Sequence, residues 1–365
     1  MNILLITNMY PSKELPYSGI FVKAQYECLQ EINEDNESVD IYCMRQVVSS
    51  KLGSYLKYLL AYVRFIPRLF KSYDIIHVHF YGILAPTAIL YKMFHPRTKL
   101  LVTMHGGDIN DDLPASGTKN KLFRKWIKSF DKVMPVGQAL HKPVMDKLGV
   151  KPDHTLCAGV DKRKFYPPTK DVEKDIDFLV VGSFLPVKGL DVLLDAIPQL
   201  DNSKAKFCFV GNGPLEESIK SMQGEYNLEI AGNKTHDELR EMYWRSKYLL
   251  FTSRGDAFGL VVTEAIYSGT PAIVCANGGA QHQISEGNNG FIYEANEADI
   301  LTQKLNQCLA LVAADYKKLA ERTPQTNSEF SLQNVCSTFL SFYRKLHYGT
   351  STIKTKSIEY GSLNS

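Results

Sequence analysis

The chain has 365 residues, which exceeds the size at which a single hydrophobic core usually stops growing, so two domains are expected. Its composition is 44% hydrophobic and 22% charged, close to that of soluble globular proteins, which excludes a disordered or fibrous chain. A net charge of +3 is too small to indicate a nucleic-acid-binding protein, and no nucleic-acid partner is expected.

The cysteines and the N-terminus indicate the compartment. Seven cysteines are scattered without metal-ligand spacing, and an odd number cannot all pair within the chain, which favours a reducing environment. The first residues lack the basic start and cleavage site of a signal peptide, and no apolar run approaches the ~20 residues of a membrane-spanning helix. We expect a cytoplasmic protein, either free in solution or peripheral on the inner face of the cell membrane.

Short apolar runs alternate with amphipathic segments along the chain, as expected for βα units that build parallel sheets. The first series of predicted strands comprises residues 3–7, 39–44, 74–80, 99–105 and 131–136. The second series comprises residues 177–182, 206–211, 226–232, 247–252 and 271–276. The expected fold class is therefore α/β, with two Rossmann-like doubly wound domains that face a central cleft.

A segment rich in proline and charge separates the two series and is typical of an exposed linker. It places the N-terminal domain at residues 1–168 and the C-terminal domain at 169–335. Residues 336–348 are predicted to form a crossover helix that packs back toward the N-terminal domain. The polar residues 349–365 are predicted to form a flexible tail.

The strongest indication of a ligand site is residues 253–279, where a predicted strand leads through a loop into a helix. Asp256 stands in the loop, followed by Phe258, and the helix is expected to end at Gly269, just before Pro271. Such a strand–loop–helix unit directs the helix N-terminus at the cleft.

The start of this helix is predicted to bind a diphosphate. The N–H groups of Gly259, Leu260 and Val261 are expected to be unpaired there, which makes the helix N-terminus an anion site. Glu264 is expected in the first turn, with its carboxylate near ribose hydroxyls. The alternative is that Glu264 only complements the helix dipole.

This stretch resembles the donor-site signature of glycosyltransferase family 4, in which two glutamates, with seven residues between them, flank a Gly-Phe-Gly-Leu core. The second acidic residue is Glu264, whereas the first is Asp256, followed by Ala257 where the family has glycine. The resemblance implies that the first carboxylate holds hydroxyls of a donor sugar.

Residues 181–196 resemble the family's strand–loop–helix that carries an arginine and a lysine toward the diphosphate. Lys188 stands at the lysine position, where it would meet the negative charge that develops on the leaving phosphate. The arginine position is Ser183, which follows Gly182 and can still donate a hydrogen bond to phosphate. Alternatively, Lys188 is a solvated loop lysine.

Two segments of the first half also resemble the family. In residues 101–110, His105 and Asp108 match a His-Gly-x-Asp segment whose histidine contacts the donor sugar near the reacting carbon. The alternative is that His105 is a structural residue at the end of a strand. Gly19 matches a glycine loop beside the donor phosphate and the acceptor, where its lack of a side chain permits close backbone approach.

No metal or other cofactor is expected. His77 and His79 lie on one face of a predicted strand, but no third ligand is visible nearby. The resemblance likewise implies a metal-independent reaction, because phosphate binding by Lys188 and a helix N-terminus replaces the divalent cation.

The resemblance covers residues 1 to about 345 and implies a retaining glycosyltransferase of the hexosyltransferase type with the GT-B fold. The donor would be a nucleotide-diphosphate sugar, with a UDP-sugar favoured over a GDP-sugar. The acceptor would be a sugar or a lipid-linked sugar held by the N-terminal domain, in the assembly of bacterial-type cell-surface polysaccharide or glycolipid. The two domains are expected to close on the donor about hinges near residues 160–170 and 330–347.

Two other functions remain open from the sequence. One is a nucleotide-sugar epimerase of the same architecture, and the other is a catalytically silent glycosyltransferase-like partner subunit. Three departures from the family pattern favour the silent subunit, namely Ser183, Asp256 and His282, the last at a position that is usually acidic. Three retained residues oppose it, namely His105, Lys188 and Glu264.

Two basic amphipathic segments predict peripheral contact with an anionic membrane. Residues 51–71 contain no acidic side chain, and four of their basic residues fall on one helical face, namely Lys57, Arg64, Arg68 and Lys71. Residues 118–132 interleave basic with apolar residues. The alternative is that both apolar faces pack on the sheet.

Overall fold

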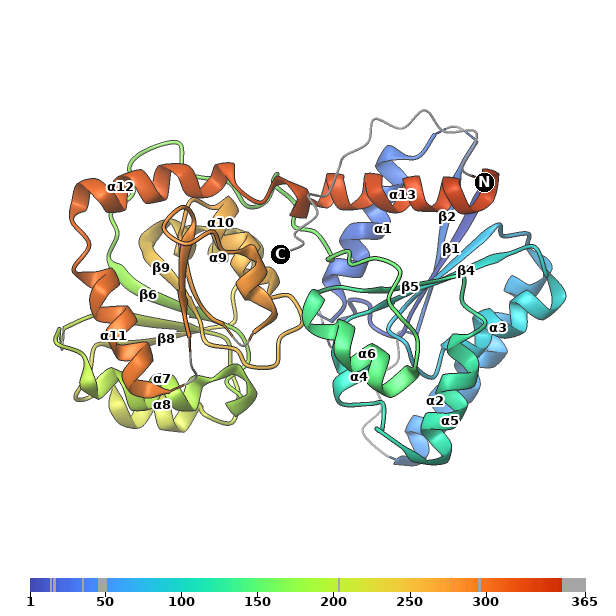
Figure 1. The fold of residues 1–365 in the computed structure, drawn as a ribbon, viewed down its shortest axis with the longest axis horizontal. Helices are drawn as coiled ribbons and strands as arrows, with labels where there is room; N and C mark the ends of the chain where they lie inside the picture. The colour runs from blue at the N-terminus through green and yellow to red at the C-terminus, as the bar shows by residue number, and fades with distance from the viewer. Residues whose placement is uncertain are drawn as a thin grey trace.

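The computed structural model describes residues 1–13, 15, 18–34, 36–44, 51–202, 204–276, 278–294 and 297–349, without the side chains of 51–55. Most of the tail predicted at 349–365, all of it after Gly349, lies outside the described residues. Two α/β domains lie side by side and are joined at one end (Figure 1).

The N-terminal domain is built on five strands, namely β1 (Asn2–Thr7), β2 (Ser38–Cys43), β3 (Ile75–His79), β4 (Lys99–Met104) and β5 (Lys132–Pro135). Its helices are α1 (Ile20–Ile32), α2 (Lys51–Phe65), α3 (Ala85–Phe94), α4 (Gly107–Asn110), α5 (Gly117–Ile127) and α6 (His141–Leu148). The strands are parallel in the order β2-β1-β3-β4-β5. The order reverses between β1 and β3, and a crevice opens beyond the carboxyl ends of the strands at such a point.

The C-terminal domain has six strands, namely β6 (Ile176–Val181), β7 (Phe207–Val210), β8 (Leu228–Gly232), β9 (Ser246–Phe251), β10 (Ala272–Cys275) and β11 (Gly290–Tyr293). Its helices are α7 (Leu190–Ala196), α8 (Glu216–Met222), α9 (His236–Arg245), α10 (Leu260–Tyr267), α11 (Ala298–Leu309) and α12 (Ala313–Arg322). The parallel order β11-β10-β9-β6-β7-β8 is that of dinucleotide-binding domains, with its switch point between β6 and β9.

The predicted strands become sheets because their side chains are apolar on both faces. Ile3, Leu4, Leu5 and Ile6 of β1 are all fully buried, as a strand between two helical layers requires. All ten predicted strands are present, so the fold class predicted from the sequence is confirmed. The edge strand β11 was not predicted.

The last helix, α13 (Leu332–Tyr348), returns to the N-terminal domain and lies beside α1 (Figure 1). It begins four residues earlier than predicted because the Ser331 side chain accepts the Asn334 N–H and caps it. Next to this cap, Val160 of the linker bonds to the backbone of Phe330 and Leu332. The two connections between the domains therefore run side by side.

None of the helices in the described ranges combines the length and the apolar character needed to cross a bilayer.

Candidate active site

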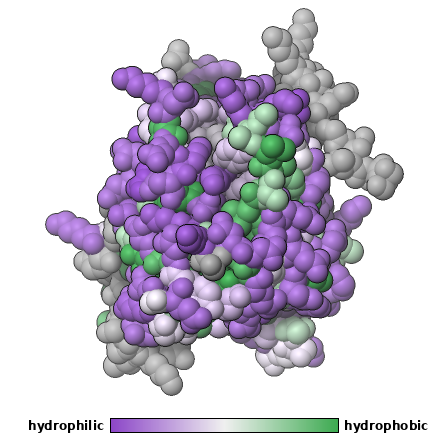
Figure 2. Space-filling model, turned by 90° about the vertical axis from the view of Figure 1, so that its left-hand side faces the viewer, coloured by the Kyte–Doolittle hydropathy of each residue, from purple (hydrophilic) through white to green (hydrophobic). Residues whose placement is uncertain are grey.

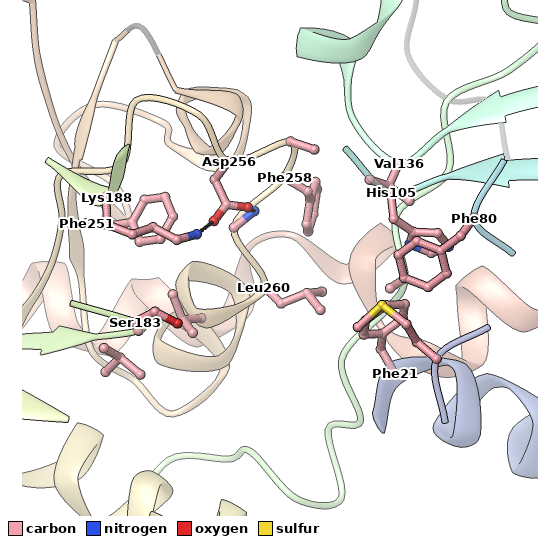
Figure 3. Close-up of a pocket in the computed structure, with 17 residues that line it drawn as sticks. Phe21, Phe80, His105, Val136, Ser183, Lys188, Phe251, Asp256, Phe258 and Leu260 are labelled. Carbon is pink, nitrogen blue, oxygen red and sulfur yellow. Dashed lines mark hydrogen bonds and ion pairs between the residues drawn. The ribbon is translucent and has the colours of Figure 1, made fainter. Parts of the chain in front are cut away.

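A pocket of about 380 Å³ lies between the domains, where the carboxyl ends of both sheets meet (Figure 3). Its N-terminal wall consists of Met9, Phe21, Phe80, His105, Val136 and Ala158. Its C-terminal wall consists of Val181, Gly182, Ser183, Lys188, Phe251, Asp256, Ala257, Phe258, Gly259, Leu260 and Val261. The loops after β1 and β3 and those after β6 and β9 thus supply both walls, because the two switch points face each other.

Most of the predicted site residues line this pocket. His105, Lys188 and Asp256 come from distant parts of the sequence and meet in this pocket. Three predicted residues do not line it, namely Gly19, Asp108 and Glu264.

Asp256 connects a cation to a helix N-terminus. Its Oδ2 lies 2.5 Å from Lys188 Nζ, and its Oδ1 accepts the Gly259 N–H at 3.1 Å (Figure 3). The prediction that the Gly259 N–H is unpaired was therefore wrong, because the Asp256 side chain caps the helix. Leu260 and Val261 begin α10 itself, where the first N–H groups have no partner within the helix.

The loop between Asp256 and α10 needs glycine and is held by a buried amide. Gly259 has φ 83°, and a Cβ there would meet the Phe251 ring at 3.1 Å. The Gln283 side chain donates to the carbonyls of Phe258 at 2.6 Å and Gly259 at 3.1 Å. Sequence reasoning missed Gln283 and considered its neighbour His282, which is exposed.

Lys188 is held at the sheet edge by the turn that follows it. Gly189 has φ 71°, and a Cβ there would lie 2.2 Å from the Thr252 carbonyl oxygen. Thr252 Oγ1 donates to the Lys188 carbonyl at 2.7 Å. The Lys188 side chain is only 32% exposed and its ammonium is ion-paired, so it is not a solvated loop lysine.

Glu264 stands in the second turn of α10, not in the first turn as predicted, because the helix begins at Leu260. Glu264 lies four residues beyond Leu260, which corresponds to about 6 Å along the helix axis. The helix dipole has little influence at that distance from the helix start. Its Oε2 accepts the Tyr243 hydroxyl at 3.0 Å. Burial raises the pKa of Glu264 to about 7.

His105 lies on the opposite wall, at the end of β4. Its ring centroid is 4.9 Å from that of Phe21 and 4.3 Å from that of Phe80, and its Nε2 is 3.2 Å from Nδ1 of His79. Burial lowers the pKa of His105 well below its usual 6.5, so the imidazole is neutral at physiological pH.

Asp108 holds the loop behind His105. Its buried carboxylate accepts the N–H groups of His105 at 3.0 Å, Gly106 at 2.9 Å and Tyr81 at 2.7 Å. Burial raises its pKa to about 6. The structure therefore places Asp108 behind the pocket, where it orients the His105 backbone and is not available to a ligand.

His77 is fully engaged with its neighbours. Its Nδ1 lies 2.6 Å from the Tyr343 hydroxyl of α13, and its Nε2 lies 2.7 Å from Thr103 Oγ1. Within the described parts of the chain, no three histidine, cysteine or acidic side chains form a metal-binding group.

Gly19 does not line the pocket but lies two residues before Phe21, which does. It has φ 64°, and a Cβ would lie 2.2 Å from the Met9 carbonyl oxygen, so glycine lets the loop after β1 approach the start of α1. That approach presents Met9 and Phe21 to the pocket. Sequence reasoning missed these apolar lining residues and Phe80, although Phe80 ends a predicted strand just as His105 does.

Comparison with known proteins identifies the family. The Glycosyltransferase Family 4 model matches residues 29–163, and the Glycosyl transferases group 1 model matches residues 161–326. N-acetyl-alpha-D-glucosaminyl L-malate synthase of Bacillus anthracis is 25% identical over 75% of this chain and 75% of its own.

Two solved structures share the fold. The sucrose-phosphate synthase of Thermosynechococcus elongatus superposes with a TM-score of 0.77 at 18% identity, covering 96% of this chain and 100% of its own. Anabaena HepE, solved in complex with UDP and glucose, gives a TM-score of 0.71 at 15% identity, covering 94% of this chain and 99% of its own. Since the two family models together span residues 29–326, the chain belongs to glycosyltransferase family 4, the group 1 glycosyltransferases, and is a glycosyltransferase of the GT-B fold.

Proposed function

We propose that the protein is a retaining glycosyltransferase that moves a sugar from a UDP-sugar to a hydroxyl acceptor. One observation carries the proposal: Lys188 and the N-terminus of α10 form one wall of a pocket whose other wall holds His105. A diphosphate bound between Lys188 and α10 would point its sugar across the pocket at His105. The fold shared with Anabaena HepE, solved with UDP and with UDP-glucose, supports uridine as the base.

Lys188 and α10 would stabilise the leaving group. The N–H groups of Leu260 and Val261 supply donors, and the helix dipole adds positive potential. The Lys188 ammonium now faces Asp256, and donor binding would let it meet the phosphate as well. Such preorganised cationic groups contribute most where charge develops in the transition state.

The side chains of the pocket favour retention. Among its described lining residues, Asp256 is the only carboxylate and is held by Lys188, while His105 is a weak base because burial lowers its pKa. The donor phosphate oxygen is then the base closest to the reacting carbon. The bond from C1 to that oxygen breaks, the acceptor oxygen bonds C1 from the same face, and the acceptor proton passes to the phosphate.

The outer helices of the N-terminal domain support an acceptor presented at a membrane. Large apolar side chains are exposed on α2, on the 3₁₀ helix η1 (Ile66–Phe70), on α3 and on α5, namely Leu56, Leu59, Val63, Ile66, Phe70, Met93, Phe94 and Leu122. Phe70 is 86% exposed and Met93 is 73% exposed. By contrast, the end of the molecule formed by the C-terminal domain is dominated by hydrophilic residues (Figure 2).

Only part of each predicted amphipathic segment packs inward. Phe65 of α2 and both Phe123 and Ile127 of α5 belong to the core. Five large apolar side chains of residues 56–70 remain exposed near Arg64 and Arg68, namely Leu56, Leu59, Val63, Ile66 and Phe70. Each basic residue near an anionic surface contributes about 1 kcal/mol. This combination supports docking on an anionic leaflet and a lipid-linked acceptor, as in the assembly of cell-surface polysaccharide or glycolipid.

The reaction is tested by incubating the full chain with UDP-sugars, alone and with acceptors, and following the anomeric protons by NMR. The expected product keeps the α configuration of the donor. An inverted product would refute the retaining mechanism. Donor binding without hydrolysis or transfer would instead indicate a silent partner subunit.

Membrane docking is tested by sedimentation with anionic and neutral vesicles at low and high salt. We expect binding to anionic vesicles that weakens with salt and is lost in Phe70→Asp. Val312→Asp, at a 67% exposed position in the C-terminal domain, is the matched control. Equal sedimentation with both lipids would refute docking and favour a soluble acceptor.

A further inference from the structure

Three aromatic rings form a continuous surface on the N-terminal wall of the pocket (Figure 3). The ring centroids of Phe21 and Phe80 lie 6.0 Å apart, and each lies within 5 Å of that of His105, at 4.9 and 4.3 Å. All three line the pocket and are partly exposed. We call this surface the aromatic wall.

The backbone of Phe80 is strained to present its ring. Its φ is 69°, a left-handed conformation that costs a residue with a Cβ about 1–2 kcal/mol. Glycine would adopt it freely, whereas Phe80 keeps the strain and leaves part of its ring exposed to the pocket. Strain of this kind is retained where a side chain is needed at a site, so the Phe80 ring has a task in the pocket.

The aromatic wall carries no charge. Its neighbours Met9, Val136 and Ala158 are apolar, and His105 is neutral. Among the described lining residues, Lys188 and Asp256 alone are charged, and they pair on the opposite wall. An anionic acceptor at the aromatic wall would lose its water without gaining a cation, which is costly.

An uncharged sugar ring fits this surface. Its axial C–H groups are weakly positive and can lie against the negative face of an aromatic ring, while its hydroxyls stay free to reach the donor. We propose that the acceptor is a neutral glycoside whose sugar ring stacks on Phe21 and Phe80, beside the donor sugar at His105. This inference rests on the proposed function. It gives the chain an uncharged acceptor, unlike the L-malate in the name of the Bacillus anthracis relative.

The test compares acceptors with the full chain and its active UDP-sugar. Octyl hexosides are the neutral acceptors, and L-malate and D-inositol 3-phosphate are the anionic ones. We expect transfer to a neutral hexoside and none to the two anions. Transfer to either anion at a comparable rate, or failure to use any neutral hexoside, would overturn the inference.

Two variants test the rings directly. Phe80→Gly should raise the acceptor KM at least tenfold, and the relief of backbone strain should offset part of the packing lost with the ring. Phe21→Leu should raise the same KM, and Phe291→Leu, in the sheet of the other domain, is its control. A KM unchanged in both wall variants would refute stacking.

Measurements of donor binding and donor hydrolysis distinguish a failure of this inference from a failure of the proposed function. A protein that binds and hydrolyses UDP-sugar, yet has the same acceptor KM in the wall variants, refutes the stacking inference alone. A protein that neither binds nor hydrolyses any UDP-sugar refutes the proposed function itself.

Discussion

Gly137 of the N-terminal domain touches Ala257 of the C-terminal domain so closely that a Cβ on Gly137 would lie 1.9 Å from the Ala257 carbonyl oxygen. Gly106 lies against the same residue, since a Cβ there would be 3.2 Å from the Ala257 Cβ. The loop that carries Asp256 and Ala257 therefore meets the opposite domain at two glycines.

Gly137→Ala should hold the domains apart. A Cβ cannot fit at 1.9 Å from a carbonyl oxygen, so either the loop or the whole domain must move. Since misplacement by about 1 Å can cost 100-fold in rate, we expect kcat to fall at least tenfold. Small-angle scattering should show that saturating UDP-sugar lowers the radius of gyration of the native protein more than that of the variant. Gly224→Ala, where a Cβ meets nothing within 4 Å, is the control.

Donor affinity should rise with pH through about 7. Burial raises the pKa of Glu264 to about 7, and the carboxylate accepts hydrogen bonds from ribose hydroxyls better than the acid does. Glu264→Ala should weaken UDP binding and abolish this dependence in calorimetry. A pH-independent affinity in the native protein would contradict the ribose assignment.

Tyr243 should set the pH at which donor affinity rises. Its hydroxyl donates to Glu264 and stabilises the carboxylate, so Tyr243→Phe should raise the pKa of Glu264 further. UDP affinity at pH 7 should fall and recover at higher pH. Tyr226→Phe removes a similar bond to Glu225 outside the site and should leave the profile unchanged. A loss of affinity at every pH would indicate a structural role instead.

Lys188→Ala should lower turnover more than donor affinity, because the charge it faces grows as the leaving group departs. We expect kcat to fall about 100- to 1,000-fold, the range for loss of one preorganised donor. The variant also leaves Asp256 without its cation, so Lys188→Ala with Asp256→Asn should recover part of the donor affinity but not the turnover. Equal losses in kcat and affinity would mean that Lys188 binds ground and transition states alike.

Asp108→Asn should destabilise the protein by about 1–3 kcal/mol, since an amide leaves one of three buried N–H groups without an acceptor. Thermal unfolding measures the loss. Because the raised pKa of Asp108, about 6, exceeds its unfolded value of 3.8, the folded state holds a proton that the unfolded state loses between those pH values. That carboxyl therefore lowers stability as pH rises from about 4 to 6. An unfolding free energy that changes equally between pH 4 and 6 in the native protein and in Asp108→Asn would contradict the burial of Asp108.

The sequence predicted the sheets better than the site. Buried strands such as β1 are apolar throughout and stand out between polar helices, whereas β11 has four residues at a sheet edge and gives no such signal. Motif spacing located Lys188 and Asp256 but not their mutual bond, because the pairing depends on the meeting of two loops from one sheet. In the sequence, Phe80 looks like a core residue at the end of a strand, and its left-handed backbone and its place in the pocket become visible only in the structure.

The position of α13 determines when the N-terminal domain can finish folding during synthesis. The N-terminal domain is synthesised first, yet the face of its sheet that contains Ile3 and Leu101 packs against Val335, Phe339 and Tyr343 of the last helix. Until the ribosome has released those residues, the part of this face that α13 covers stays exposed while the entire C-terminal domain is made, and α1 packs only on another part of the face. The half of the protein that is synthesised first is thus the last to be completed, and its apolar sheet is open to chaperones or to aggregation throughout translation.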